Sequence, residues 1–118
     1  MIKYVVLLRR RPDVTREEFE RAWLVDHHAL VARLPGLRAY AFSPVVDVED
    51  YAAACDGMGE LWFDDVESAM AAFESEIGQL VRADTGTFAD SAQATRFFAR
   101  DAAVMGLSSV EAAIARRG

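Results

Sequence analysis

One stretch of the sequence carries a histidine at a spacing suited to proton transfer. Phe19, Trp23 and His27 recur every four residues, which places the three side chains on one side of an α-helix. The two large apolar side chains predict that this side faces a hydrophobic core. His27 then lies at the border of the core, where its surroundings set its pKa and tautomer. An imidazole that titrates near neutrality both takes and returns protons, so we predict that His27 is the catalytic residue of any enzymatic activity.

The other candidate titratable residues are His28, Glu60 and Asp90. His28 is rotated by about 100° from His27 on an ideal helix, so we expect it to face solvent or a subunit surface. Two adjacent histidines lack the four-residue spacing of a helical metal site, and no cysteine or carboxylate completes a zinc set; we expect no metal. Glu60 and Asp90 are candidate acidic partners of His27. The alternative role of His27 is packing at the core edge with one hydrogen-bond partner.

Aromatic side chains with polar tips occur on three expected strands. Tyr4, Tyr40 and Trp62, together with Trp23, are predicted to bind substrate by lining a flat aromatic pocket. The alternative is that they fill the core with their polar tips hydrogen-bonded. Arg9, Arg10 and Arg11 either bind a carboxylate or phosphate or form a solvated strand end. Cys55 is the only cysteine, which precludes an internal disulfide, and it is expected to be a structural thiol.

The elements that must position these residues follow in the order β-α-β-β-α-β. Strands are predicted over residues 2–8, 37–46, 58–63 and 94–100. A first helix is predicted over 16–33, with a capping box at Thr15–Glu18 and a stop at Pro35-Gly36. A second helix begins after Asp64, which is positioned to cap it. Residues 78–93 are expected to be a short helical or irregular stretch, and a last short helix is expected from Ser108 or Ser109 to Arg117.

This order is that of a ferredoxin-like α+β fold, whose four-stranded antiparallel sheet carries helices on one face. The first, second and fourth strands look apolar on both sides. An apolar sheet face of several hundred Å² does not stay exposed on a soluble monomer, so we expect a homodimer made through the sheet face. A hydrophobic fraction of 53% in 118 residues agrees with this expectation.

Composition narrows the classes of function. The net charge of −6 argues against nucleic-acid binding, which needs a basic face. No apolar run approaches the roughly 18 residues of a membrane span and no signal peptide opens the chain, so we expect a cytoplasmic protein without a membrane partner. No dinucleotide fingerprint or phosphate-loop glycine pattern occurs, and we expect no cofactor.

The chain resembles the EthD-like family of dimeric α/β-barrel proteins. The resemblance covers roughly residues 2–100 and predicts a domain over 1–104, followed by a helical tail over 105–118. The matching segments are Lys3–Pro12, Thr15–Phe19, Trp23-x-x-x-His27, Leu34-Pro35-Gly36-Leu37-Arg38-x-Tyr40 and Asp56–Asp65. The family histidine falls on His27. A usual glycine and proline after it are His28 and Ala29 here, which predicts a more regular helix.

The resemblance implies a ferredoxin-like homodimer with a pocket between each sheet and its helices. It also implies a small cofactor-independent enzyme that moves protons on hydrophobic cyclic or polyketide-derived ligands, by dehydration, decarboxylation or lactone isomerisation. We therefore predict a lyase (dehydratase) or isomerase that uses His27 as general acid and base. One alternative is a non-catalytic ligand-binding or accessory protein of a catabolic or biosynthetic cluster. A second alternative is a cofactor-free monooxygenase.

Overall fold

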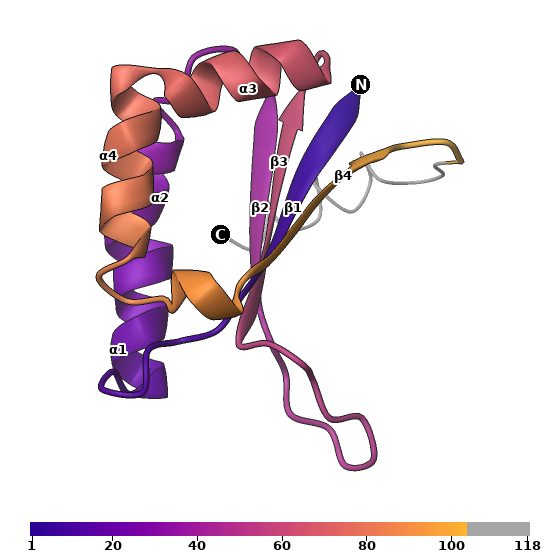
Figure 1. Cartoon of the computed structure of the whole chain (residues 1–118). Coiled ribbons are helices and arrows are strands. Elements are labelled where there is room, and N and C mark those ends of the chain that lie inside the picture. The colour runs from indigo at the N-terminus through magenta and orange to yellow at the C-terminus, as the bar shows by residue number, and fades with distance from the viewer. Residues whose placement is uncertain (104–118) are drawn as a thin grey trace, which may run out of the picture.

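Helices cover one face of a four-stranded antiparallel sheet, and within residues 1–103 no helix covers the other face, which is called the open face below (Figure 1). The computed structural model describes residues 1–103. The strands are β1 (Ile2–Leu8), β2 (Ala39–Pro44), β3 (Gly57–Phe63) and β4 (Thr95–Arg100), in the order β2-β3-β1-β4. The predicted ferredoxin-like α+β fold is confirmed. The tail helix predicted over 108–117 and the domain boundary after residue 104 lie outside the described residues.

The first helical segment is not one regular helix but three successive parts. It comprises α1 (Arg16–Arg21), the π-helix η1 (Ala22–His27) and α2 (His28–Val31). The predicted capping box is present, because the Thr15 hydroxyl accepts from the Glu18 amide and the Glu18 carboxylate accepts from the Thr15 amide. The prediction of a more regular helix is wrong, since a π-helix closes wider i→i+5 turns. Gly36 follows the helix with a φ of 77°, a conformation that glycine adopts without strain.

The second helical segment also differs from the prediction. Helix α3 spans Val66–Glu74 and is capped by Asp65, whose side chain accepts from the Ser68 amide. Asp64 does not cap it and instead binds Arg38 at 2.8 Å. Where a short helical or irregular stretch was expected over residues 78–93, the chain forms the ten-residue helix α4 (Glu76–Thr85). Ser75 explains the break, because its extended backbone ends α3 and its hydroxyl accepts from the Gly78 amide in α4.

Side chains alternate between the two faces of the sheet, as strand geometry requires. The predicted face partition of the third strand is confirmed, since Leu61 and Phe63 are buried under the helices and Trp62 lies on the other side. The apolar run of β1 is broken by Lys3 alone, which lies on the open face and binds Glu60 at 2.9 Å.

The core beneath the helices forms two clusters that meet at Phe42. One cluster contains Val31, Leu34, Leu61, Phe63, Ala69 and Ala72, and the other contains Leu8, Phe19, Trp23, Phe88 and Ala89. The Trp23 ring stacks on Phe42 with 5.0 Å between centroids. The same ring lies against the backbone of Gly57, where a Cβ would come within 2.4 Å of it. A glycine at the start of β3 therefore lets the Trp23 side of the helix approach the sheet.

Candidate functional site

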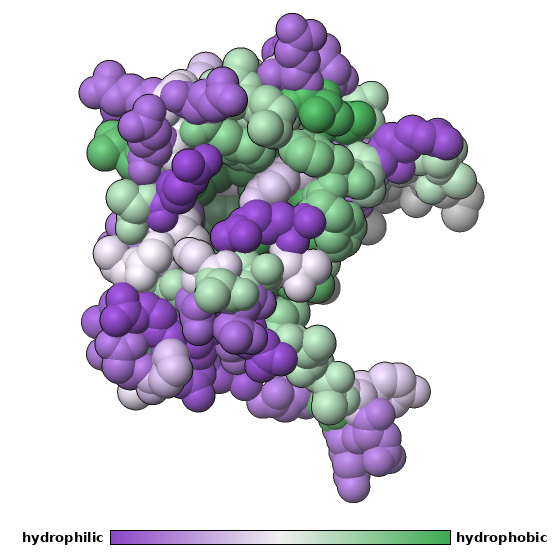
Figure 2. Space-filling view, in the orientation of Figure 1, coloured by the Kyte–Doolittle hydropathy of each residue, from purple (hydrophilic) through white to green (hydrophobic). Residues whose placement is uncertain are grey.

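A cavity of about 510 Å³ lies between the sheet and the helices, where the two core clusters meet. Its walls are mainly apolar and include Val6, Phe42 and Phe73. In Figure 2 the hollow is green inside, and hydrophilic side chains stand beside its mouth. Cavities of about 300–1,000 Å³ with a few polar groups are typical of small-molecule sites. The volume is sufficient for a ring system.

His27 is the buried titratable side chain of this cavity. It ends the π-helix η1 and is only 4% exposed. Its Nδ1 lies 2.7 Å from Oδ2 of Asp84, in the last turn of α4. Phe88 packs edge-on against the imidazole, with 5.1 Å between the ring centroids. The ring is thus fixed by one carboxylate and by aromatic packing.

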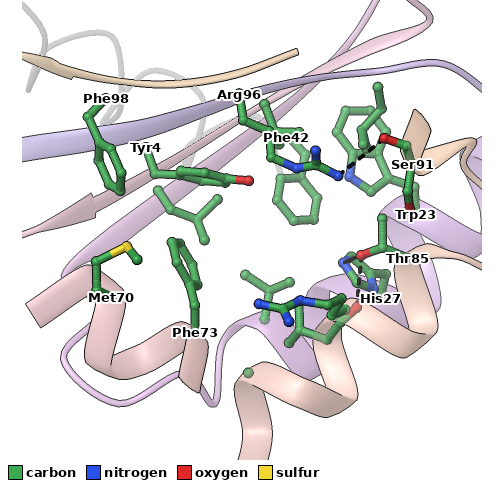
Figure 3. A pocket seen from close by; sticks show the side chains of 17 residues that line it. Tyr4, Trp23, His27, Phe42, Met70, Phe73, Thr85, Ser91, Arg96 and Phe98 are labelled. Carbon is green, nitrogen blue, oxygen red and sulfur yellow. Dashed lines mark hydrogen bonds between the residues drawn. The ribbon is translucent and has the colours of Figure 1, made fainter. Parts of the chain in front are cut away.

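The hydrogen bonds around the imidazole define its tautomer. A carboxylate is only an acceptor, so Asp84 requires a proton on Nδ1 and leaves the Nε2 lone pair free in the neutral ring. The Thr85 Oγ1 lies 3.3 Å from Nε2 and donates its own proton to the Val81 carbonyl at 2.8 Å. Thr85 can therefore accept from Nε2 once His27 is protonated. His27 and Thr85 both line the cavity (Figure 3). A proton that Nε2 takes from a ligand in the cavity can therefore form a hydrogen bond to the Thr85 hydroxyl oxygen.

The pKa of His27 lies below its ordinary value of 6.5. Burial is the largest cause, because it penalises the charged imidazolium, and the Asp84 carboxylate opposes the shift through its hydrogen bond and charge. The imidazole is therefore neutral at pH 7 and has a free lone pair on Nε2. This is the state that a general base needs.

A second polar group lies on the cavity wall around Tyr4. The Tyr4 ring projects from β1 into the cavity, and Arg96 projects from β4 beside it (Figure 3). Burial raises the pKa of the Tyr4 hydroxyl, while Arg96 and Arg82 act in the opposite direction. Arg82 lies on α4 and also lines the cavity. Tyr4 stays protonated at neutral pH and can donate a hydrogen bond.

The structure brings together three of the five residues singled out as site residues. His27, Trp23 and Tyr4 line the cavity. Tyr40 is not among the lining residues, although it lies on the same face of the sheet, and its hydroxyl lies 3.0 Å from Nδ1 of His28. Trp62 lies on the open face, where its Nε1 donates to Asp101 at 3.0 Å. His28, which was expected to face solvent or a subunit surface, is half-buried beside Tyr40.

The candidate acidic partners of His27 were misassigned. Glu60 lies on the open face with Lys3, and Asp90 caps the 3₁₀ turn η2 (Ser91–Gln93) by accepting from the Ala92 amide. Asp84, Thr85, Arg82 and Arg96 were missed. Asp84 and Thr85 lie on α4, in a stretch that was expected to be either short helical or irregular, so the sequence did not indicate which way their side chains face.

The arginines after β1 are held by other parts of the chain. Arg10 donates to the Val14 carbonyl, and Arg11 binds Asp13 and the Gly86 carbonyl. Arg9 is exposed. Within residues 1–103 no three His, Cys, Asp or Glu side chains converge to hold a metal ion. No helix in the same range is long and apolar enough to cross a membrane.

The fold and the site define a ferredoxin-like α+β protein with a ligand-sized cavity beneath its helices. The chain belongs to the EthD family, since the EthD domain model matches residues 11–92. No curated protein matches the sequence significantly.

Several solved structures share the fold. One is an EthD family protein from Bacillus halodurans, with a TM-score of 0.73, 22% identity and coverage of 86% of this chain and 100% of the other. A dimeric ferredoxin-like protein from Thermobifida fusca has a TM-score of 0.66 and 19% identity, with coverage of 85% and 90%. SnoaB, a cofactor-independent oxygenase from Streptomyces nogalater, has a TM-score of 0.63 and 12% identity, with coverage of 88% and 95%. At these identities the likeness concerns the fold.

Proposed function

We propose that this protein is a small cofactor-independent lyase (dehydratase) or isomerase, in which His27 moves a proton on a hydrophobic cyclic substrate. One observation carries the proposal: a buried, neutral imidazole, oriented by Asp84, lines a mainly apolar cavity of about 510 Å³. A packing histidine needs a partner but no adjoining cavity. The cavity therefore favours a role in chemistry.

The chemistry follows from the two ring nitrogens. Asp84 holds the proton on Nδ1, and Nε2 removes a proton from the substrate carbon next to a carbonyl. The electron pair of the broken C–H bond moves into an enolate. In an isomerisation, Nε2 returns the proton to a different carbon. In a dehydration, the enolate expels a hydroxyl group and Nε2 gives that group the proton, which leaves as water. Thr85 accepts a hydrogen bond from Nε2 while the imidazole is charged.

Two neighbouring groups assist this chemistry. The Tyr4 hydroxyl, protonated at neutral pH, can donate to the carbonyl oxygen on which charge develops. Trp23 and Phe42 stack on each other with 5.0 Å between centroids and supply part of the aromatic wall of the cavity. Their rings lie within the same cavity as the imidazole.

The test is hydrogen–deuterium exchange at carbon, because it reports proton transfer before the natural substrate is known. 2-Tetralone, a bicyclic ketone with acidic CH groups, is incubated in D₂O with the parent protein, and its CH signals are followed by NMR. We expect the protein to accelerate the exchange, and His27→Gln to lower the acceleration by about 10²–10⁴. His28→Gln is the matched control, since His28 does not line the cavity.

Each outcome distinguishes the alternatives. Binding of 2-tetralone without accelerated exchange favours a non-catalytic ligand-binding protein. Equal exchange in the parent and in His27→Gln removes His27 from the mechanism. Oxygen consumption with an anthrone substrate favours the cofactor-free monooxygenase; the structural neighbour SnoaB is a cofactor-independent oxygenase.

A further inference from the structure

Two exposed arginines line the mouth of the mainly apolar cavity, although the proposed proton transfer does not need them. Arg82 comes from α4 and Arg96 from β4, so the two guanidinium groups approach from the helix layer and from the sheet. Cavities for neutral ring systems do not require a positive charge. The two positive charges therefore indicate that the ligand has a group that they can bind.

Neither guanidinium is neutralised by a carboxylate in the part of the chain that the structure describes. The side-chain ion pairs of residues 1–103 involve Lys3, Arg11, Arg16, Arg38 and His27, and omit both cavity arginines. Arg96 makes a single long hydrogen bond, 3.5 Å to the Ser91 carbonyl (Figure 3). Such a contact is weak, so the guanidinium can turn toward a ligand at little cost.

The positions of the two arginines relative to the His27 imidazole indicate how a ligand lies in the cavity. Arg82 precedes Thr85 by three residues, so both lie on the same side of α4. Arg96 lies beside the Tyr4 hydroxyl on the sheet. A ligand that fills the cavity thus meets Arg82, near Thr85 and His27, on the helical wall, and Arg96 with the Tyr4 hydroxyl on the sheet wall. Phe73, Phe98 and Met70 provide the apolar surface beside them.

We propose that the ligand of this cavity carries a carboxylate, bound by Arg82, Arg96 and the Tyr4 hydroxyl, on a flat hydrophobic ring system that reaches His27. Guanidinium groups match the planar geometry of a carboxylate and bind it with charge-assisted hydrogen bonds. The carboxylate also fixes which carbon of the ring faces Nε2. The two arginines are therefore specificity-determining residues, and this inference rests on the proposed function because it concerns the same cavity.

The test compares two aromatic probes of nearly the same shape, 2-naphthoate and 2-naphthamide, by isothermal titration calorimetry. We expect the parent protein to bind 2-naphthoate at least about tenfold more tightly, the ratio that corresponds to about 1.4 kcal/mol. The double variant Arg82→Gln/Arg96→Gln removes this preference, because it weakens the binding of 2-naphthoate far more than that of 2-naphthamide. Arg33→Gln is the matched control, because Arg33 is exposed and does not line the cavity; it keeps the preference.

Equal affinity of the parent for the two probes, or a preference that persists in the double variant, overturns the inference. So does failure of the parent to bind either probe. The binding measurement involves no turnover, so its failure is distinguishable from a failure of the proposed function, which is loss of the His27-dependent deuterium exchange. Circular dichroism of the double variant confirms that it is folded.

Discussion

At the scale of single residues, the site depends on a pair of side chains that are 57 positions apart in the chain. His27 and Asp84 meet at 2.7 Å, and the carboxylate both orients the ring and fixes its tautomer. Asp84 is a positioning residue, because its side chain is 40% exposed and contacts the imidazole from the side opposite Nε2. The reactivity of Nε2 is thus set from outside the cavity.

Replacing Asp84 by Asn tests this arrangement. An amide NH₂ group donates to Nδ1 and shifts the proton of the neutral ring to Nε2, which can then no longer act as a base. We expect Asp84→Asn to lower the deuterium exchange of 2-tetralone by about 10²-fold or more with little change in its binding. Asp84→Glu keeps a carboxylate and is expected to restore part of the exchange. A full rate in Asp84→Asn contradicts the positioning role.

The lowered pKa of His27 also predicts a pH dependence of stability. Histidine in the unfolded chain has a pKa of about 6.5, and in the folded protein the pKa of His27 is lower. Between these two values the unfolded state binds a proton that the folded state does not bind. The free energy of unfolding therefore falls as the pH falls from 6.5 toward the folded pKa. Above pH 6.5 His27 is neutral in both states, so it does not lower the free energy of unfolding there.

Urea denaturation at about pH 7.5 and about pH 5.5 measures this effect. We expect the loss of stability between the two pH values to be smaller in His27→Gln than in the parent, because glutamine does not titrate. His28→Gln is the matched control for replacing a histidine by glutamine. An identical loss in the parent and in His27→Gln contradicts a lowered pKa for His27.

At the scale of elements, the π-helix η1 and helix α4 together form the helical wall of the site. The wider turns of η1 end at His27, and π-helical segments occur frequently at functional sites. Helix α4 packs against η1 and α2 and carries Arg82, Asp84 and Thr85 along its last turns. The site therefore needs both helical segments seated correctly on the sheet.

The contact between Trp23 and Gly57 controls this seating. A methyl group at Gly57 would lie 2.4 Å from the Trp23 ring, so the helix must shift in Gly57→Ala. We expect a loss of about 1–3 kcal/mol in the free energy of unfolding and a weaker binding of 2-tetralone. Trp23→Ala is expected to cost about 3–5 kcal/mol, since its ring is fully buried. Urea denaturation measures both variants.

Gly86→Ala is the control for the glycine variant. Gly86 follows α4 with a φ of −64°, and an added Cβ meets its nearest neighbour at 3.5 Å, which is ordinary contact. It should leave the stability unchanged or raise it by about 0.4–1 kcal/mol. A Gly57→Ala protein as stable as Gly86→Ala would mean that the tryptophan does not limit the approach of the helix to the sheet.

The sequence predicted the local part of this arrangement and missed its tertiary part. The Phe19–Trp23–His27 face and the Thr15 capping box depend on spacings of three or four residues, so they could be recognised directly. Asp84 could not be assigned, because its distance from His27 depends on how α4 docks on η1. The role of Trp62 was open for another reason: alternation within a strand groups its side chains into two sets without telling which set faces the helices.

At the scale of the whole molecule, the open face of the sheet combines apolar and charged side chains. Val5 and Phe97 lie opposite each other on β1 and β4, and Lys3 binds Glu60 at 2.9 Å and lies 3.7 Å from Asp101. The Glu60 hydrogen bond raises the pKa of Lys3. The charges of this face are thus already paired within one subunit, which lowers the cost of covering them with another surface.

We predict that two copies of the chain pair through this open face, in agreement with the dimeric ferredoxin-like neighbours. Multi-angle light scattering at micromolar concentration should give twice the chain mass of 13.0 kDa. Phe97→Glu places a charge on the face of the proposed interface and should yield a monomer. Val66→Glu is the matched control: Val66 is 44% exposed, close to the 46% of Phe97, but begins α3 on the helical side, so this variant should remain dimeric. A monomeric parent would mean that the chain does not dimerise. A dimeric Phe97→Glu would place the subunit contact on another surface.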